Sequence, residues 1–175
     1  MTNVIFSHGQ ESGPWGTKIR AMSERVKALG CNADSIDYQG IADPAERVEK
    51  LIRECKGISE PLILVGSSMG GHVATAAADA LSAAGLFLLA PAYYMEGYED
   101  LTPPPPSMPI AIVHGWHDDI VPVENSIRYA RECSASLHLV DGDHRLTENI
   151  RAINHHLEQF VRNIGDTHKS RRETL

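Results

Sequence analysis

Short apolar segments alternate with amphipathic segments along most of the chain. Six apolar segments have the length of strands, and most lack polar alternation, as strands covered on both faces should. We predict strands near residues 4–7, 33–37, 62–65, 86–90, 110–114 and 137–140. The intervening segments carry apolar residues at helical spacing. This alternation predicts an α/β fold with a mostly parallel central sheet of about six strands and helices on both faces.

Local signals mark the ends of the predicted helices. The first helix stops at Gly30, a residue suited to the position after a helix end. Asp43 begins the second helix as its N-cap, with Pro44 in the first turn. A third helix follows the glycine-rich segment 66–71, and the last one covers residues 147–164.

Composition and charge limit the class of protein. The chain has 175 residues, of which 42% are hydrophobic and 22% charged, and it contains no repeat, so we predict one domain over residues 1–165 and a flexible tail over residues 166–175. The net charge of −7 argues against nucleic acid and against stable membrane insertion. The three cysteines show no metal or disulfide spacing. No signal-peptide pattern opens the chain, so we expect a cytoplasmic location.

One long segment, residues 91–109, connects two predicted strands and contains four consecutive prolines. It is too short for a lid domain, so we predict a stiff extended connector. Its Tyr93, Tyr94 and Met95, together with Trp15, are candidates for lining a substrate pocket at a strand end. Packing of these aromatic residues against the surface explains them about as well.

Two adjacent serines lie within the sequence Gly66-Ser67-Ser68-Met69-Gly70-Gly71. A nucleophile on a tight strand-to-helix turn requires small residues two positions before and two positions after it. Ser68 satisfies this spacing and Ser67 does not. The alternative is a tight turn with a serine cap. The segment matches neither a phosphate loop nor a dinucleotide-binding turn.

The residues that could activate Ser68 follow later strands. Asp118 and Asp119 are adjacent in the loop after the fifth strand, where an acid would be expected, although either could instead cap a turn. His144 lies in the loop after the sixth strand, which suits a general base. A metal site formed by His114, His117, Asp118 and Asp119 is less favoured, because the spacing matches no common ligand pattern.

An oxyanion hole would need two backbone N–H groups. One would come from Met69, the residue after Ser68, and the other from Gln10 in the glycine-containing loop after the first strand. We expect His8 in the same loop to be structural.

The chain resembles the α/β-hydrolase superfamily in the order Ser68, Asp118, His144, each at the end of a successive strand region. The resemblance covers nearly the whole chain. It rests on His8-Gly9, on the segment 66–71, on His114-Gly115 followed by Asp118, and on Gly142-Asp143-His144. The resemblance implies a compact α/β-hydrolase fold with no lid domain, with Ser68 as nucleophile, Asp118 rather than Asp119 as the acid, and His144 as base.

In having Ser12, Pro14 and Lys18 after His8-Gly9, the chain is also similar to small lidless serine esterases and acyl thioesterases. This similarity implies hydrolysis of a small-molecule acyl ester or thioester with no cofactor and no metal. A catalytically inactive α/β-hydrolase scaffold that acts as a binding protein is the alternative. A metal-dependent hydrolase is a third possibility. The sequence leaves the oligomeric state open.

Overall fold

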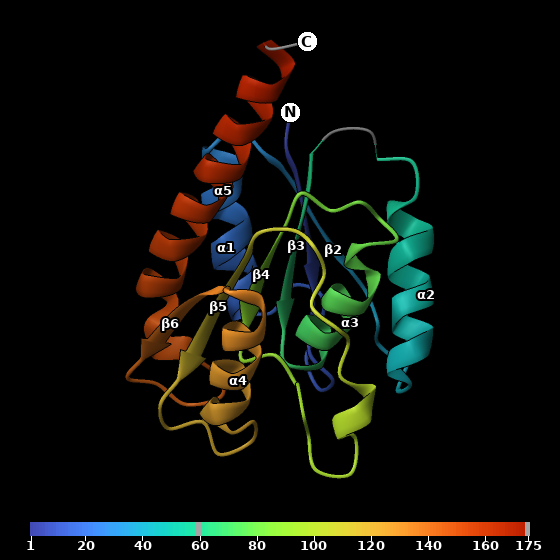
Figure 1. Ribbon diagram of the computed structural model, residues 1–175, viewed down its shortest axis with the longest axis vertical. Coiled ribbons are helices and arrows are strands. Elements are labelled where there is room, and N and C mark those ends of the chain that lie inside the picture. Colours follow the sequence, from blue (N-terminus) through green and yellow to red (C-terminus); the bar gives the residue numbers. More distant parts are fainter. Residues whose placement is uncertain (59–60, 174–175) are drawn as a thin grey trace.

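The computed structural model describes residues 1–58 and 61–173 (Figure 1). Six strands form one sheet in the order β2-β1-β3-β4-β5-β6, and all neighbouring strands are parallel. The fold class and the six predicted strands are therefore confirmed, with ends that differ by one or two residues. The strands are β1 (Asn3–Ser7), β2 (Asn32–Ile36), β3 (Leu62–Ser67), β4 (Gly85–Leu89), β5 (Ile110–Gly115) and β6 (Ser136–Val140).

Helices cover both faces of the sheet. Successive side chains in a strand point to opposite faces, so strands that are apolar throughout give the sheet two apolar faces that must be buried. In β3, for example, Leu62 and Leu64 pack on one side, whereas Ile63 and Val65 pack on the other. Helices α1 (Thr17–Ala28) and α5 (Ile150–Glu173) cover the second side, and α2 (Pro44–Cys55), α3 (Met69–Ala78) and α4 (Val123–Cys133) cover the first. No separate lid is evident in the described part of the chain.

The helix ends follow from local chemistry. The Asp43 carboxylate accepts a hydrogen bond from the Ala45 N–H, which caps α2. Gly30 has φ +80° after the end of α1, a conformation that glycine adopts at little cost. The last helix extends beyond the predicted end at residue 164 and reaches Glu173. Residues 166–173 are thus helical where the sequence suggested a flexible tail, and 174–175 lie outside the described residues.

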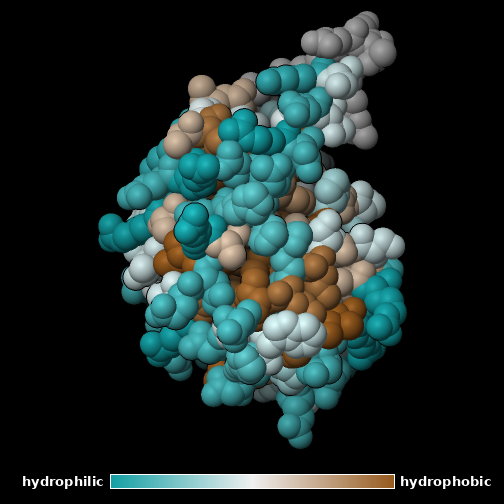
Figure 2. All heavy atoms as spheres, turned by 90° about the vertical axis from the view of Figure 1, so that its left-hand side faces the viewer, coloured by the Kyte–Doolittle hydropathy of each residue, from teal (hydrophilic) through white to brown (hydrophobic). Residues whose placement is uncertain are grey.

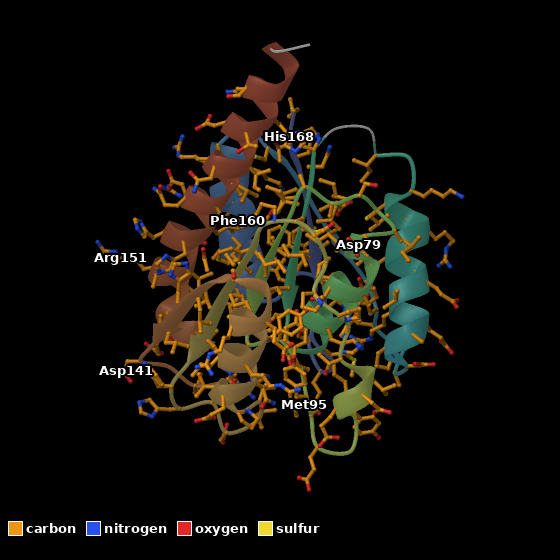
Figure 3. The ribbon with its side chains drawn as sticks, in the orientation of Figure 1. Asp79, Met95, Asp141, Arg151, Phe160 and His168 are labelled. Carbon is orange, nitrogen blue, oxygen red and sulfur yellow. The ribbon has the colours of Figure 1, made fainter. Side chains whose placement is uncertain are left out.

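Helix α5 packs its apolar side on the sheet and turns its polar side outward. Phe160 lies on the sheet side, with its ring 5.8 Å from that of Phe87, whereas Arg151 points away (Figure 3). Figure 2 shows the side of the molecule that lies to the left in Figure 1, where the surface is mostly hydrophilic and apolar residues gather at about mid-height. None of the described helices combines the length and apolar character that a membrane span requires.

The carboxyl ends of β1 and β3 lie side by side, with Ser7 in register with Gly66. From these two ends the chain turns to opposite faces, into α1 and α3 respectively. Such a switch point leaves a crevice beyond the sheet, where ligands of open α/β sheets bind. The loop after β1 and the serine pair after β3 meet there.

Candidate active site

Ser68 occupies a sharp turn between β3 and α3. Its backbone has φ 53° and ψ −121°, outside the regions that residues with side chains usually adopt. The turn is possible because strand and helix approach closely: a Cβ added to Gly66 would lie 2.5 Å from the Gly70 carbonyl oxygen, and one added to Gly70 would lie 2.0 Å from that of Ser7. The glycine spacing around Ser68 therefore has a direct steric cause.

Ser68, His144 and Asp118 form a hydrogen-bonded chain. The Ser68 Oγ lies 3.1 Å from His144 Nε2, and His144 Nδ1 lies 2.7 Å from Asp118 Oδ2. Because the carboxylate can only accept, Nδ1 carries the donated proton, which leaves Nε2 to accept from the serine hydroxyl. This arrangement can remove a proton from Ser68.

The Asp118 carboxylate is fully buried yet well supplied with donors. Its Oδ1 accepts the N–H groups of Ile120 at 2.9 Å and Val121 at 2.8 Å. Burial by itself would raise the pKa of Asp118, but the hydrogen bonds from His144 and these two N–H groups outweigh it, so the pKa is lowered. Asp118 thus stays ionised beside His144.

A second histidine, His114 at the end of β5, also contacts Asp118. Its Nε2 lies 3.0 Å from Asp118 Oδ2 and 3.0 Å from the Val121 carbonyl, while its Nδ1 lies 2.7 Å from Ser126 Oγ. Both neighbours of Nε2 only accept, so Nε2 carries the hydrogen and Nδ1 accepts from Ser126. Burial lowers the pKa of His114, which favours this neutral ring.

The loop after β1 is held from behind by Arg47 of α2. Arg47 is 2% exposed, and its guanidinium donates to the carbonyls of Ile41, His8, Gly9 and Gln10 at 2.7 to 3.5 Å. His8 adds a hydrogen bond from Nδ1 to the Gly9 carbonyl and accepts the Tyr38 N–H at Nε2. The carbonyls of this loop are therefore fixed on the side away from Ser68.

The predicted oxyanion donors lie on the two segments that flank Ser68. Met69 begins α3, and Gln10 lines the hollow beside Ser68. A Cβ built on Gly9 would lie 3.7 Å from the Ser68 Cβ, which shows how closely the loop approaches. Among the hydrogen bonds of the described residues, none uses the N–H of Gln10 or Met69.

A hollow of about 900 Å³ opens next to Ser68, between the loop after β1, the start of α1 and the His144 loop. Ile19 and Met22 of α1, which are 6% and 1% exposed, lie at the base of the hollow. Lys18 lines it too, with its Nζ 3.4 Å from Ser67 Oγ, and burial lowers the pKa of Lys18 to about 8. The two adjacent serines thus have different neighbours, Lys18 for Ser67 and His144 for Ser68.

The structure does not bring the predicted pocket residues Trp15, Tyr93, Tyr94 and Met95 into this hollow, whose described lining includes none of them. Tyr93 is 0% exposed, stacks on Tyr129 at 4.0 Å and hydrogen bonds Thr75. Tyr94 hydrogen bonds Glu132. Trp15 packs against α1 beneath Lys27. Met95 lies in the segment 91–109 at the end of the molecule where the strands finish (Figure 3). Packing, rather than pocket lining, accounts for the aromatic residues.

The four residues considered for a metal site do not converge on one point. His114 and Asp118 contact each other, His117 pairs with Asp141 at 3.0 Å, and Asp119 is exposed at the hollow. The described residues contain no group of three metal-ligating side chains.

The contacts of Lys18, Arg47 and His114 were not predicted from the sequence. Arg47 could have been noticed, because it precedes the buried Leu51 by four residues and Cys55 by eight, on the buried stripe of α2. His114 ends an otherwise apolar buried strand. Lys18 entered only through the resemblance to compact esterases, and its contact with Ser67, which lies far away in the sequence, has no local signal.

A parallel sheet with a serine at this turn defines an α/β protein of the hydrolase type. Residues 1–169 match the family model described as an alpha/beta hydrolase domain, so the chain belongs to the alpha/beta hydrolase family. It is similar to the mouse protein named palmitoyl-protein thioesterase ABHD10, mitochondrial, with 29% identity over 206 residues, covering 83% of this chain and 69% of the mouse protein.

Solved structures agree on the fold. A protein of the alpha/beta hydrolase superfamily from Xanthomonas campestris pv. campestris superposes with a TM-score of 0.81 and 29% identity, covering 92% of this chain and 98% of the other. Mouse alpha/beta hydrolase domain-containing protein 10 gives a TM-score of 0.79 at 22% identity, covering 93% and 90%. Est1E from Butyrivibrio proteoclasticus, with ferulic acid bound, gives 0.78 at 16% identity, covering 93% and 89%. The last two likenesses concern the fold alone.

Proposed function

We propose that this hydrolase is a serine hydrolase that cleaves carboxylic esters or thioesters through an acyl-enzyme intermediate. The observation that carries the proposal is the hydrogen-bonded chain from Ser68 through His144 to the ionised Asp118, with Ser68 on a strained turn at the sheet's switch point. Ser68 is the nucleophile, His144 the general base and Asp118 the residue that orients His144.

The reaction proceeds in two balanced steps. His144 Nε2 takes the Ser68 proton as Oγ bonds to the acyl carbon; the carbon–oxygen or carbon–sulfur bond then breaks, and the departing alcohol or thiol receives that proton. Water next gives a proton to His144 and attacks the acyl-enzyme, and Ser68 recovers its proton as the acid leaves. The N–H groups of Gln10 and Met69 stabilise the oxyanion in both steps.

The open hollow supports substrates with short or medium acyl groups, or an acyl chain displayed on a larger molecule. The name of the mouse relative describes a thioesterase that acts on palmitoyl-protein, which favours including thioesters among the substrates. The same name places that relative in mitochondria, so the cytoplasmic location remains a prediction for this chain.

Treatment with a fluorophosphonate, followed by intact-mass analysis, tests the proposal. One adduct is expected on the native protein and on Ser67→Ala, because Ser67 contacts Lys18 rather than His144. The adduct should be absent from Ser68→Ala. No adduct on folded native protein would favour the inactive scaffold, and an adduct that survives in Ser68→Ala would assign the nucleophile to another residue.

A further inference from the structure

The ammonium group of Lys18 has no evident structural reason to lie where it does. Lys18 is half-buried in the wall of the hollow, and its Nζ donates to the Ser67 hydroxyl at 3.4 Å. It forms no ion pair with any residue that the structure describes. Removing part of the water around a cation costs free energy when no anion is paired with it. A residue at this cost is expected to serve a ligand.

The helix that carries Lys18 does not stabilise its charge. Lys18 is the second residue of α1, at the positive end of the helix dipole, where cations are disfavoured. The first turn of α1 contains no acidic residue that would compensate. The N-terminus of α1 and the ammonium group of Lys18 therefore both contribute positive potential on this side of the hollow.

The two carboxylates whose charges attract Lys18 are already engaged elsewhere. Asp118 is bound to His144 and to backbone N–H groups, and Asp143 accepts the Leu146 N–H at 3.0 Å within its own loop. The attraction of these two carboxylates partly offsets the cost of burying the ammonium, but neither carboxylate forms an ion pair with it among the described contacts.

The other charged residues of the hollow lie at its exposed rim. Glu11, Asp119, Asp143 and Arg145 are all exposed to solvent. Water and salt screen such charges strongly. Among the charged side chains that line the described hollow, Lys18 is therefore the one that is not fully exposed, and it lies beside Ser67.

We propose that Lys18 selects substrates that carry an anionic group, a carboxylate or a phosphate, a few atoms from the scissile carbonyl. Lys18 is then a specificity residue. The anion could belong to the acyl part or to the leaving alcohol or thiol, and both would offer the same chemistry to the ammonium. That the bound molecule is a substrate rests on the proposed function. The preference for an anion does not, because binding measurements test it without catalysis.

Binding of non-hydrolysable anilides, measured by calorimetry, separates the inference from catalysis. Adipic acid monoanilide and hexanoic anilide form a pair with and without an acyl carboxylate; 4-acetamidobenzoate and acetanilide form the pair for the leaving side. The native protein should bind the anionic member of at least one pair more tightly. Lys18→Met should reduce that preference about tenfold or more, as expected for a hydrogen bond to a charged group.

Matched variants complete the test. Lys18→Arg keeps the charge and should retain part of the preference, while Lys27→Met, on the same helix but outside the described lining of the hollow, should retain all of it. Equal affinities within both pairs, binding too weak to measure, or a preference unchanged in Lys18→Met would overturn the inference. A Lys18-dependent preference in a protein that gives no fluorophosphonate adduct would instead reject only the proposed serine hydrolysis.

Discussion

The Nε2 of His114 lies 3.0 Å from Asp118 Oδ2, the same oxygen that His144 contacts at 2.7 Å. One carboxylate oxygen thus accepts from two imidazoles, one in the reactive chain and one packed in the interior. We therefore expect His114 to act on the proposed reaction through Asp118, as a positioning residue.

Replacing His114 by leucine removes one donor from a buried carboxylate. Because hydrogen bonds lower the pKa of Asp118 below its unfolded value, the carboxylate stabilises the fold at neutral pH, and this contribution is lost as pH falls through the lowered pKa. We expect His114→Leu to lower the free energy of unfolding at pH 7 by about 1–3 kcal/mol and to lower kcat more than it raises KM.

Urea denaturation across a pH series and ester kinetics would measure both effects of His114→Leu. The difference in unfolding free energy from the native protein should shrink in acid. His117→Ala, which removes an exposed histidine, is the control and should change neither quantity. A deficit that stays constant with pH would assign His114 to packing alone.

The close approach at the serine turn makes opposite predictions for two glycines. A Cβ at Gly70 would meet the Ser7 carbonyl, so Gly70→Ala should lower the free energy of unfolding by about 1–3 kcal/mol and slow fluorophosphonate labelling. At Gly165, within α5, a Cβ would meet nothing within 4 Å, so Gly165→Ala should raise stability by about 0.5–1 kcal/mol. Thermal and urea unfolding would compare them, and equal effects would refute the steric account.

Arg47 should matter to catalysis although it lies behind the loop. Arg47→Met would leave several buried carbonyls without a donor, which should cost about 1–3 kcal/mol of unfolding free energy. Loss of the loop geometry should also misplace the Gln10 N–H and lower kcat about tenfold or more. Arg53→Met, exposed on the same helix, is the control. Normal kcat in a destabilised Arg47→Met would show that the loop keeps its shape without the guanidinium.

The preference of Lys18 for anions should depend on pH. Burial lowers the pKa of Lys18 to about 8, against the attraction of Asp143 and Asp118, so the ammonium loses its charge as pH rises through that value. Binding of the preferred anionic anilide should weaken between about pH 7 and 9. Lys18→Arg stays charged throughout, so its binding should remain level. A parallel decline in both proteins would trace the effect to another group.

The parts of this molecule that the sequence predicted are those set by local patterns. The strands follow from apolar runs, and the choice of Ser68 over Ser67 follows from glycine spacing. Strand ends that meet at one edge of a parallel sheet placed His144 and the pair Asp118 and Asp119 near Ser68, and the resemblance to α/β-hydrolases then favoured Asp118.

The parts that the sequence did not predict depend on contacts between distant segments. Whether Tyr93 faces a cavity or a core is decided by Tyr129 of α4, which stacks on it, and not by its neighbours in the chain. The contact between Lys18 and Ser67 likewise forms only when the fold brings α1 beside the end of β3.

The segment 91–109 is fastened along its length: Asn125 donates to the Tyr93 carbonyl, Thr102 accepts the Tyr94 N–H, and Tyr129 donates to the Pro103 carbonyl. Substitutions in this segment would therefore do little to change the range of acyl groups accepted, because most of them would disrupt these contacts and destabilise the fold. A mutant library directed to residues 10–18, the exposed and half-buried stretch that leads into α1, would vary the walls of the hollow while leaving that scaffold intact.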